Sequence, residues 1–147
     1  MSAAAATLPR PARTASVTRA IAVGVAGAGV ATLLRVVDPT QPGHYPACPT
    51  FALTGFYCPG CGALRAMHYL TCGELGSAWA MNPLVVLAVP YLLWAWSSWL
   101  YRGATGRTRR WAAPGWWVVT LGVGIVVFGV LRNVPGLEFL APHAGPS

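Results

Sequence analysis

The residues whose side chains are best suited to reaction or metal binding lie in one short stretch, Cys58-Pro59-Gly60-Cys61-Gly62. A Pro-Gly pair forms a tight turn, which brings the two thiols close together. The apolar pattern after this turn predicts a helix, so both cysteines come just before a helix N-terminus. Unpaired N–H groups and the helix dipole stabilise a thiolate at such a position. The stretch is therefore suited to thiol chemistry or to metal binding.

Three interpretations of the cysteines remain open. In the first, Cys58 and Cys61 form a redox-active pair with the spacing of thioredoxin-like sites, although no βαβ pattern surrounds them. In the second, the same pair binds zinc together with two further ligands. The candidates for these ligands are His44, Cys48, His68 and Cys72. In the third, structural disulfides hold together a loop too small to build its own core. The cysteines available for such disulfides are Cys48, Cys58, Cys61 and Cys72.

Arg65 is the only formally charged residue between Asp38 and Glu74. A cation near a membrane interface needs a partner. An ion pair with Glu74 or Asp38 would be purely structural. Binding an anionic headgroup or substrate would be functional, and His68, on the same predicted helix, could join either arrangement.

The composition places the chain among integral membrane proteins. Hydrophobic residues make up 55% of the sequence, which has seven Trp and only three acidic residues. The formal net charge of +7 comes from ten arginines and no lysine. These arginines lie at the ends of apolar segments and not along one face, so we expect membrane anchoring and no binding of nucleic acid.

Three apolar segments predict transmembrane helices over residues 17–37, 83–101 and 115–132. The second segment has a clear start at Asn82-Pro83, because Asn is a favoured N-cap and Pro is tolerated at the first helical position. Trp and Tyr residues concentrate at the segment ends, as they do at membrane interfaces. A cleaved signal peptide is the alternative for the first segment, but no small-residue cleavage site follows it closely.

The arginines also predict the orientation. Four of them lie in the loop over residues 102–114, two lie in the tail over residues 1–16, which we expect to be disordered, and Arg19 follows shortly after that tail. These two regions would face the cytoplasm. Residues 38–82 and 133–147 would then be extracytoplasmic, with the C-terminus outside. Within residues 38–82 we expect two short interfacial helices, one ending at Gly73 and one over residues 75–81.

The order of motifs resembles a bacterial membrane family known as domain of unknown function 2752. The resemblance covers about a quarter of the chain. Its residues are Cys48-Pro49, Leu53-Thr54-Gly55, Cys58-Pro59-Gly60-Cys61-Gly62, Arg65-Ala66, Gly73-Glu74, Ala78 and Asn82-Pro83-Leu84. It implies a small multi-pass membrane protein, located in the bacterial cell membrane and without an assigned activity.

The sequence thus predicts an all-α membrane protein with three transmembrane helices and a short, cysteine-containing extracytoplasmic cap. We interpret it as a binding or accessory protein rather than an enzyme, with the cap as a structural or docking element. A thiol–disulfide redox protein and a metal-binding protein are the alternatives. Expected partners are membrane lipid and either a second copy or another membrane protein. No Ser-His-Asp set, phosphate-binding loop or paired carboxylates are present.

Overall fold

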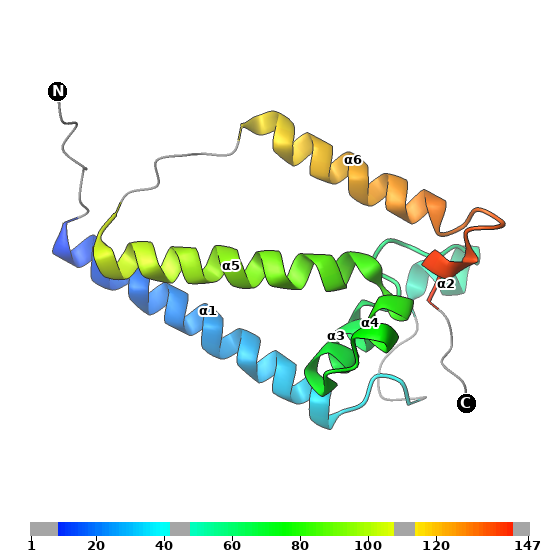
Figure 1. The fold of residues 1–147 in the computed structure, drawn as a ribbon, viewed down its shortest axis with the longest axis horizontal. Helices are drawn as coiled ribbons and strands as arrows, with labels where there is room; N and C mark the ends of the chain where they lie inside the picture. Colours follow the sequence, from blue (N-terminus) through cyan, green and yellow to red (C-terminus); the bar gives the residue numbers. More distant parts are fainter. Residues whose placement is uncertain (1–8, 42–47, 108–113, 143–147) are drawn as a thin grey trace.

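The computed structural model describes residues 9–41, 48–107 and 114–142, and within them all regular elements are helical (Figure 1). Two long helices, α1 and α5, lie against each other, and three short helices form a cap at one end of the pair. A third apolar helix, α6, runs apart from both. We use the term cap for residues 48–82, which connect to α5 through Asn82.

Helix α1 (Arg10–Val36) begins earlier than the predicted span over residues 17–37. Residues 10–16, which we expected to be disordered, are therefore helical, and that prediction is wrong. The reason is tertiary: the first turns of α1 pack on the end of α5. There the Arg13 guanidinium donates to the carbonyl of Ala104, and Trp99 Nε1 donates to Ser16 Oγ at 3.1 Å. Residues 1–8 lie outside the described part of the chain.

Small residues allow α1 and α5 to approach closely. Trp96 of α5 lies over Gly24, where an added Cβ would be only 2.6 Å from the Trp96 ring. The same indole donates a hydrogen bond to the carbonyl of Ala20 at 2.9 Å, and Ala20 is fully buried. Ala20 and Gly24 thus serve packing within the chain.

Helix α5 (Pro83–Thr105) starts where the sequence predicts, with Asn82 as its N-cap and Pro83 at the first position. The Asn82 side chain accepts a hydrogen bond from the Val85 N–H at 3.3 Å. The helix continues past the predicted end at residue 101 and stops at Gly106, which has φ of 72°. Residues 102–105 therefore belong to the helix and not to the loop.

The cap contains α2 (Pro49–Thr54), α3 (Ala63–Cys72) and α4 (Leu75–Met81). The sequence predicted α3, with its end at Gly73, and α4 with both of its boundaries; the structure confirms these predictions. Helix α2 was not predicted, because one and a half turns give too short a periodic pattern. It ends at Gly55, a glycine with φ of 72°.

Helices α1 and α5 are long and apolar enough to cross a membrane. In the most apolar stretch of α5 no residue is fully buried inside the protein, so much of its apolar surface stays exposed. Helix α6 (Gly115–Leu131) is uniformly apolar but has only 17 residues. Its C-terminal end approaches the cap (Figure 1), and a short 3-10 helix, Glu138–Leu140, follows.

Replacing Gly62 by Ala is expected to destabilise the cap. Gly62 has φ of 76°, and an added Cβ would lie 2.6 Å from the carbonyl oxygen of Met81. Left-handed backbone strain alone costs an L-residue about 1–2 kcal/mol, and the clash adds to it. Gly60→Ala is the matched control, because its nearest atom would be Cys58 Sγ at 3.9 Å. Thermal unfolding in detergent should show a lower Tm for Gly62→Ala only; equal effects would contradict this packing.

A candidate metal-binding site at three cysteines

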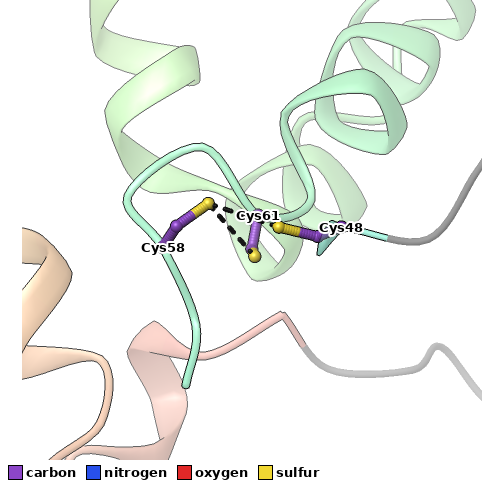
Figure 2. Close-up of side chains that lie close together, drawn as sticks. All are labelled: Cys48, Cys58 and Cys61. Carbon is purple, nitrogen blue, oxygen red and sulfur yellow. Dashed lines mark hydrogen bonds between the residues drawn. The ribbon is translucent and has the colours of Figure 1, made fainter. Parts of the chain in front are cut away.

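Three of the four cysteines bring their sulfur atoms to one place. Cys58 Sγ lies 3.4 Å from Cys61 Sγ and 3.6 Å from Cys48 Sγ, and all three sulfurs lie within 4.8 Å of one another. Figure 2 shows the thiols converging from two segments, the turn between α2 and α3 and the residue just before α2. All four cysteines are free thiols in this structure, and the disulfide interpretation stays a prediction.

The turn itself is formed by local backbone hydrogen bonds. The Cys61 N–H donates to the carbonyl of Cys58, and the Ala63 N–H donates to the carbonyl of Gly60, each at 3.0 Å. Gly62 then takes the left-handed conformation from which α3 begins. The turn therefore sets the positions of Cys58 and Cys61, as the Pro-Gly pair predicted.

Asn82 holds the turn from the start of α5. Its Nδ2 donates to the carbonyls of Pro59 at 3.0 Å and Cys61 at 3.1 Å, while its Oδ1 caps α5. The side chain is fully buried, and every polar atom of it has a partner. One residue thus both starts a membrane-length helix and fixes the cysteine turn.

Arg132 holds the turn from the end of α6 and is only 2% exposed. Its guanidinium donates to four backbone carbonyls and lies 5.1 Å from the centre of the Phe128 ring. These carbonyls, at 2.8–3.3 Å, belong to Cys58, Pro59, Met81 and Leu140. All of these acceptors are neutral, so a buried cation lies beside the cysteines without a carboxylate among its hydrogen-bond acceptors.

Asn133 and Gly129 complete the contact between α6 and the cap. The Asn133 amide makes two hydrogen bonds with the backbone of Tyr57, accepting at 2.8 Å and donating at 2.9 Å. Gly129 faces Pro59, where an added Cβ would lie 3.0 Å from Pro59 Cδ. Helix α6 thus contacts the residues immediately around Cys58.

The thiols of the site differ in acidity. A backbone hydrogen bond from Phe51, with help from the neighbouring thiols, lowers the pKa of Cys48 to about 7. Burial raises the pKa of Cys61 to about 12, and hydrogen bonding to the other two thiols adds to this. Near neutral pH the cluster therefore has one thiol that ionises readily and one that holds its proton until a cation displaces it.

The structure separates the other predicted metal ligands from this cluster. His68 and Cys72 lie together on α3, where the Cys72 Sγ is 3.8 Å from His68 Nε2, and neither belongs to the three-cysteine group. His44 lies outside the described residues. Of the four candidates between which the spacing could not choose, the structure thus places Cys48 beside Cys58 and Cys61.

Arg65 and Glu74 do not form the ion pair that we considered. Arg65 Nε points to the carbonyl of Pro39 at 3.4 Å, and the Glu74 carboxylate accepts from the Ser77 hydroxyl at 3.0 Å. His68 Nε2 lies 3.6 Å from Asp38 Oδ1, a contact that is an ion pair only when the imidazole is protonated. A pairing of Arg65 with Asp38 stays a prediction. An anion-binding role for Arg65 stays a prediction.

Comparison with known proteins supports the resemblance drawn from the motifs. Residues 48–96 match the family model described as Protein of unknown function (DUF2752). The match confirms the resemblance over this segment. It begins at Cys48 and includes all four cysteines and Asn82, but it ends before α6. Searches of curated proteins and of solved structures each find no match.

Sequence reasoning missed Arg132 as a site residue, because we interpreted it only as the end of the third apolar segment. One signal was present: Arg132-Asn133 is a pair of strong hydrogen-bond donors directly after an uncharged segment. A buried turn needs such donors for its carbonyls. Only the contact with the turn shows that these two residues supply them.

We expect the metal-free, reduced protein to alkylate at Cys48 before Cys61. With a pKa near 7, Cys48 is about half thiolate at neutral pH, whereas Cys61 stays protonated. Iodoacetamide labelling across a pH series, followed by peptide mass spectrometry, should give a Cys48 rate with a midpoint near pH 7. Faster labelling of Cys61 than of Cys48 would contradict this ordering of the thiols.

Replacing Arg132 by Lys should weaken the cap although the charge is kept. A single ammonium cannot reach carbonyls on both sides of the guanidinium, and each buried carbonyl left without a donor costs about 1–3 kcal/mol. The control is Arg107→Lys, since Arg107 is exposed and its guanidinium donates to the Tyr101 hydroxyl and lies over the Tyr101 ring. The control should change the free energy of unfolding by less than about 0.5 kcal/mol. Similar losses in both variants would argue against the role of Arg132.

Proposed function

We propose that this protein is a metal-binding membrane protein whose cap is held together by a zinc ion on Cys48, Cys58 and Cys61. The convergence of three thiols carries this proposal. Sulfurs bound to one tetrahedral zinc at about 2.3 Å lie about 3.8 Å from one another. The observed separations of 3.4 and 3.6 Å are close to this value. Thiolates are also the ligands that zinc and other soft metals prefer.

The charge around the site supports the same conclusion. A divalent ion with three thiolates carries one net negative charge, and the buried guanidinium of Arg132 carries one positive charge. A buried cation is costly unless an opposite charge lies nearby. Without a metal, the ionisation of Cys48 supplies only about half a negative charge near neutral pH, because Cys61 retains its proton. The metal complex supplies it without any carboxylate.

A bound metal would also stabilise the cap, which has little hydrophobic core of its own. The cap buries few side chains completely: Cys61, Ala66, Ala78, Met81 and Asn82 are its core residues. A small element with so little core gains its folding free energy from a bound metal or a disulfide. We therefore propose that the metal is structural and that the cap is a docking element of an accessory protein, as the sequence suggested.

For the membrane arrangement we propose three spans in a bacterial cell membrane. Helices α1 and α5 have the required length, and α6 extends about 26 Å at 1.5 Å per residue, near the roughly 30 Å of a hydrocarbon core. The cytoplasmic side would hold the N-terminus and the arginine-rich loop, and the cap would be extracytoplasmic. Lipid, a second copy or another membrane protein would contact the exposed apolar faces.

A thiol–disulfide redox function is the second candidate, favoured by one specific observation. Cys48, with a pKa near 7, lies 3.6 Å from Cys58, which in turn lies 3.4 Å from Cys61. A thiolate at that position could attack a Cys58–Cys61 disulfide. The two candidates differ in metal content and in the oxidation state of the purified protein.

The protein purified without chelator should contain about one zinc per chain, measured by elemental analysis and by release on alkylation of the thiols. Replacing Cys48, Cys58 or Cys61 by Ser should each remove the metal, because each supplies a ligand. Cys72→Ser is the matched control, since Cys72 lies outside the cluster, and it should retain the metal. A metal-free wild-type protein with a Cys58–Cys61 disulfide would reject the zinc proposal and favour the redox function.

A further inference from the structure

A second group of reactive side chains lies at the junction of α1 and α3, apart from the three-cysteine site. Cys72 Sγ lies 3.8 Å from His68 Nε2, and the same nitrogen lies 3.6 Å from Asp38 Oδ1. His68 and Cys72 are four residues apart on α3, so they share one helix face. Asp38 follows the end of α1. The group therefore brings together a thiol, an imidazole and a carboxylate.

The orientation of the His68 ring is fixed by its other nitrogen. Nδ1 lies 2.7 Å from the carbonyl oxygen of Leu34, a buried residue of α1. A carbonyl only accepts hydrogen bonds, so Nδ1 carries the proton and neutral His68 has its lone pair on Nε2. That lone pair is on the nitrogen nearest to Cys72 and is free to accept the thiol proton.

The surroundings favour the charged pair that proton transfer creates. Asp38 lies beside the nitrogen that takes up the proton, and its side chain is only 29% exposed. From α1, Arg35 donates to the carbonyl of Thr71, next to Cys72, and adds a positive charge near the thiol. On α3, the Tyr69 ring contacts the His68 ring edge to face at 5.6 Å. Thus one carboxylate faces the imidazole and one guanidinium lies near the thiol.

Cys72 itself is exposed, in contrast to His68, whose side chain is 13% exposed. An activated thiol is accessible to a reagent and lies next to a base, and a third group orients that base. Cys72, His68 and Asp38 have this arrangement. Nothing in the three-cysteine site uses this group, and no residue of that cluster contacts it in the described part of the chain.

We propose that Cys72 is a reactive thiol, activated by His68 and Asp38, that forms mixed disulfides with low-molecular-weight disulfides. His68 Nε2 takes the proton of the Cys72 thiol, and the thiolate attacks one sulfur of the disulfide. A new S–S bond forms to Cys72 while the old S–S bond breaks; the Cys72 sulfur is oxidised and the departing sulfur is reduced. The departing thiolate then takes the proton from His68. The expected extracytoplasmic side of the cap suits this chemistry, because disulfides persist in oxidising compartments.

The test measures the rate at which Cys72 forms a mixed disulfide with bis(2-hydroxyethyl) disulfide, a neutral probe, in the full-length, zinc-treated protein. Peptide mass spectrometry separates Cys72 from the other cysteines. An ordinary thiol is only a few per cent ionised near neutral pH, so Cys72 should react about tenfold faster in the folded protein than in the urea-unfolded chain. Equal rates in the two states would overturn the proposal.

Two variants separate activation from folding. In His68→Asn the amide nitrogen replaces Nδ1 and keeps the hydrogen bond to the Leu34 carbonyl, but no base remains beside Cys72. The rate of mixed-disulfide formation should therefore fall about tenfold near neutral pH. Asp38→Asn removes only the carboxylate charge. Its rate should fall less, and its pH–rate profile should lie between those of the wild-type protein and His68→Asn. Thermal unfolding of each variant reports whether the fold is retained.

The pH–rate profile gives the decisive readout. The rate of the wild-type protein should exceed that of His68→Asn about tenfold near neutral pH, and the two rates should converge at high pH, where hydroxide removes the thiol proton without the imidazole. A wild-type profile that coincides with that of folded His68→Asn would overturn the proposal. Zinc content is read on the same samples, so failure of the three-cysteine site is seen separately from failure at Cys72.

Discussion

The carbonyl groups of the cysteine turn constrain the rest of this structure. Residues 58–61 lie between two short helices and belong to neither, so helical hydrogen bonding cannot satisfy their backbone. A carbonyl buried without a donor costs as much as a lost hydrogen bond. Local N–H groups serve the carbonyls of Cys58 and Gly60. The donors to Pro59 and Cys61, and a second donor to Cys58, come from far along the sequence, from Asn82 at the start of α5 and from Arg132 at the end of α6. Three chain segments must therefore meet for the turn to be buried.

This requirement links the cap to the membrane-length helices. Asn82 is at once the N-cap of α5 and a donor to the turn, so the start of α5 cannot shift without disturbing the cysteines. Helix α6 approaches the fold at its C-terminal end, where Gly129, Arg132 and Asn133 contact the turn and its neighbours. The position of α6 thus depends on the same few hydrogen bonds that hold the three thiols together.

The two thiol sites of the protein differ in how the thiol proton is removed and the negative charge of the thiolate is stabilised. At the turn, burial disfavours the thiolate of Cys61, and the nearby guanidinium of Arg132 favours negative charge. A metal ion resolves this conflict, because it replaces the proton of Cys61 and leaves a net negative complex beside a cation. At Cys72 the thiol is exposed and a neighbouring imidazole takes the proton instead. The first arrangement is suited to holding a structure and the second to reacting.

The sequence by itself determined the elements whose signals are local. Apolar segments and the arginines at their ends predicted membrane-length helices, and Asn82-Pro83 and Gly73 marked helix boundaries, because capping depends on neighbouring residues. The Pro-Gly turn likewise placed Cys58 beside Cys61. The early start of α1 and the late end of α5 were missed, because each of these ends is stabilised by packing on the other.

Only the tertiary structure decided which residues share a site. Spacing left His44, Cys48, His68 and Cys72 as equal candidates for the remaining metal ligands. The fold brings Cys48 to the turn and pairs His68 with Asp38 and Cys72 elsewhere. It also places Arg132 against Cys58, although they are 74 residues apart in the chain. Such contacts depend on how helices pack, and packing between distant segments leaves no periodic or spacing pattern in the sequence.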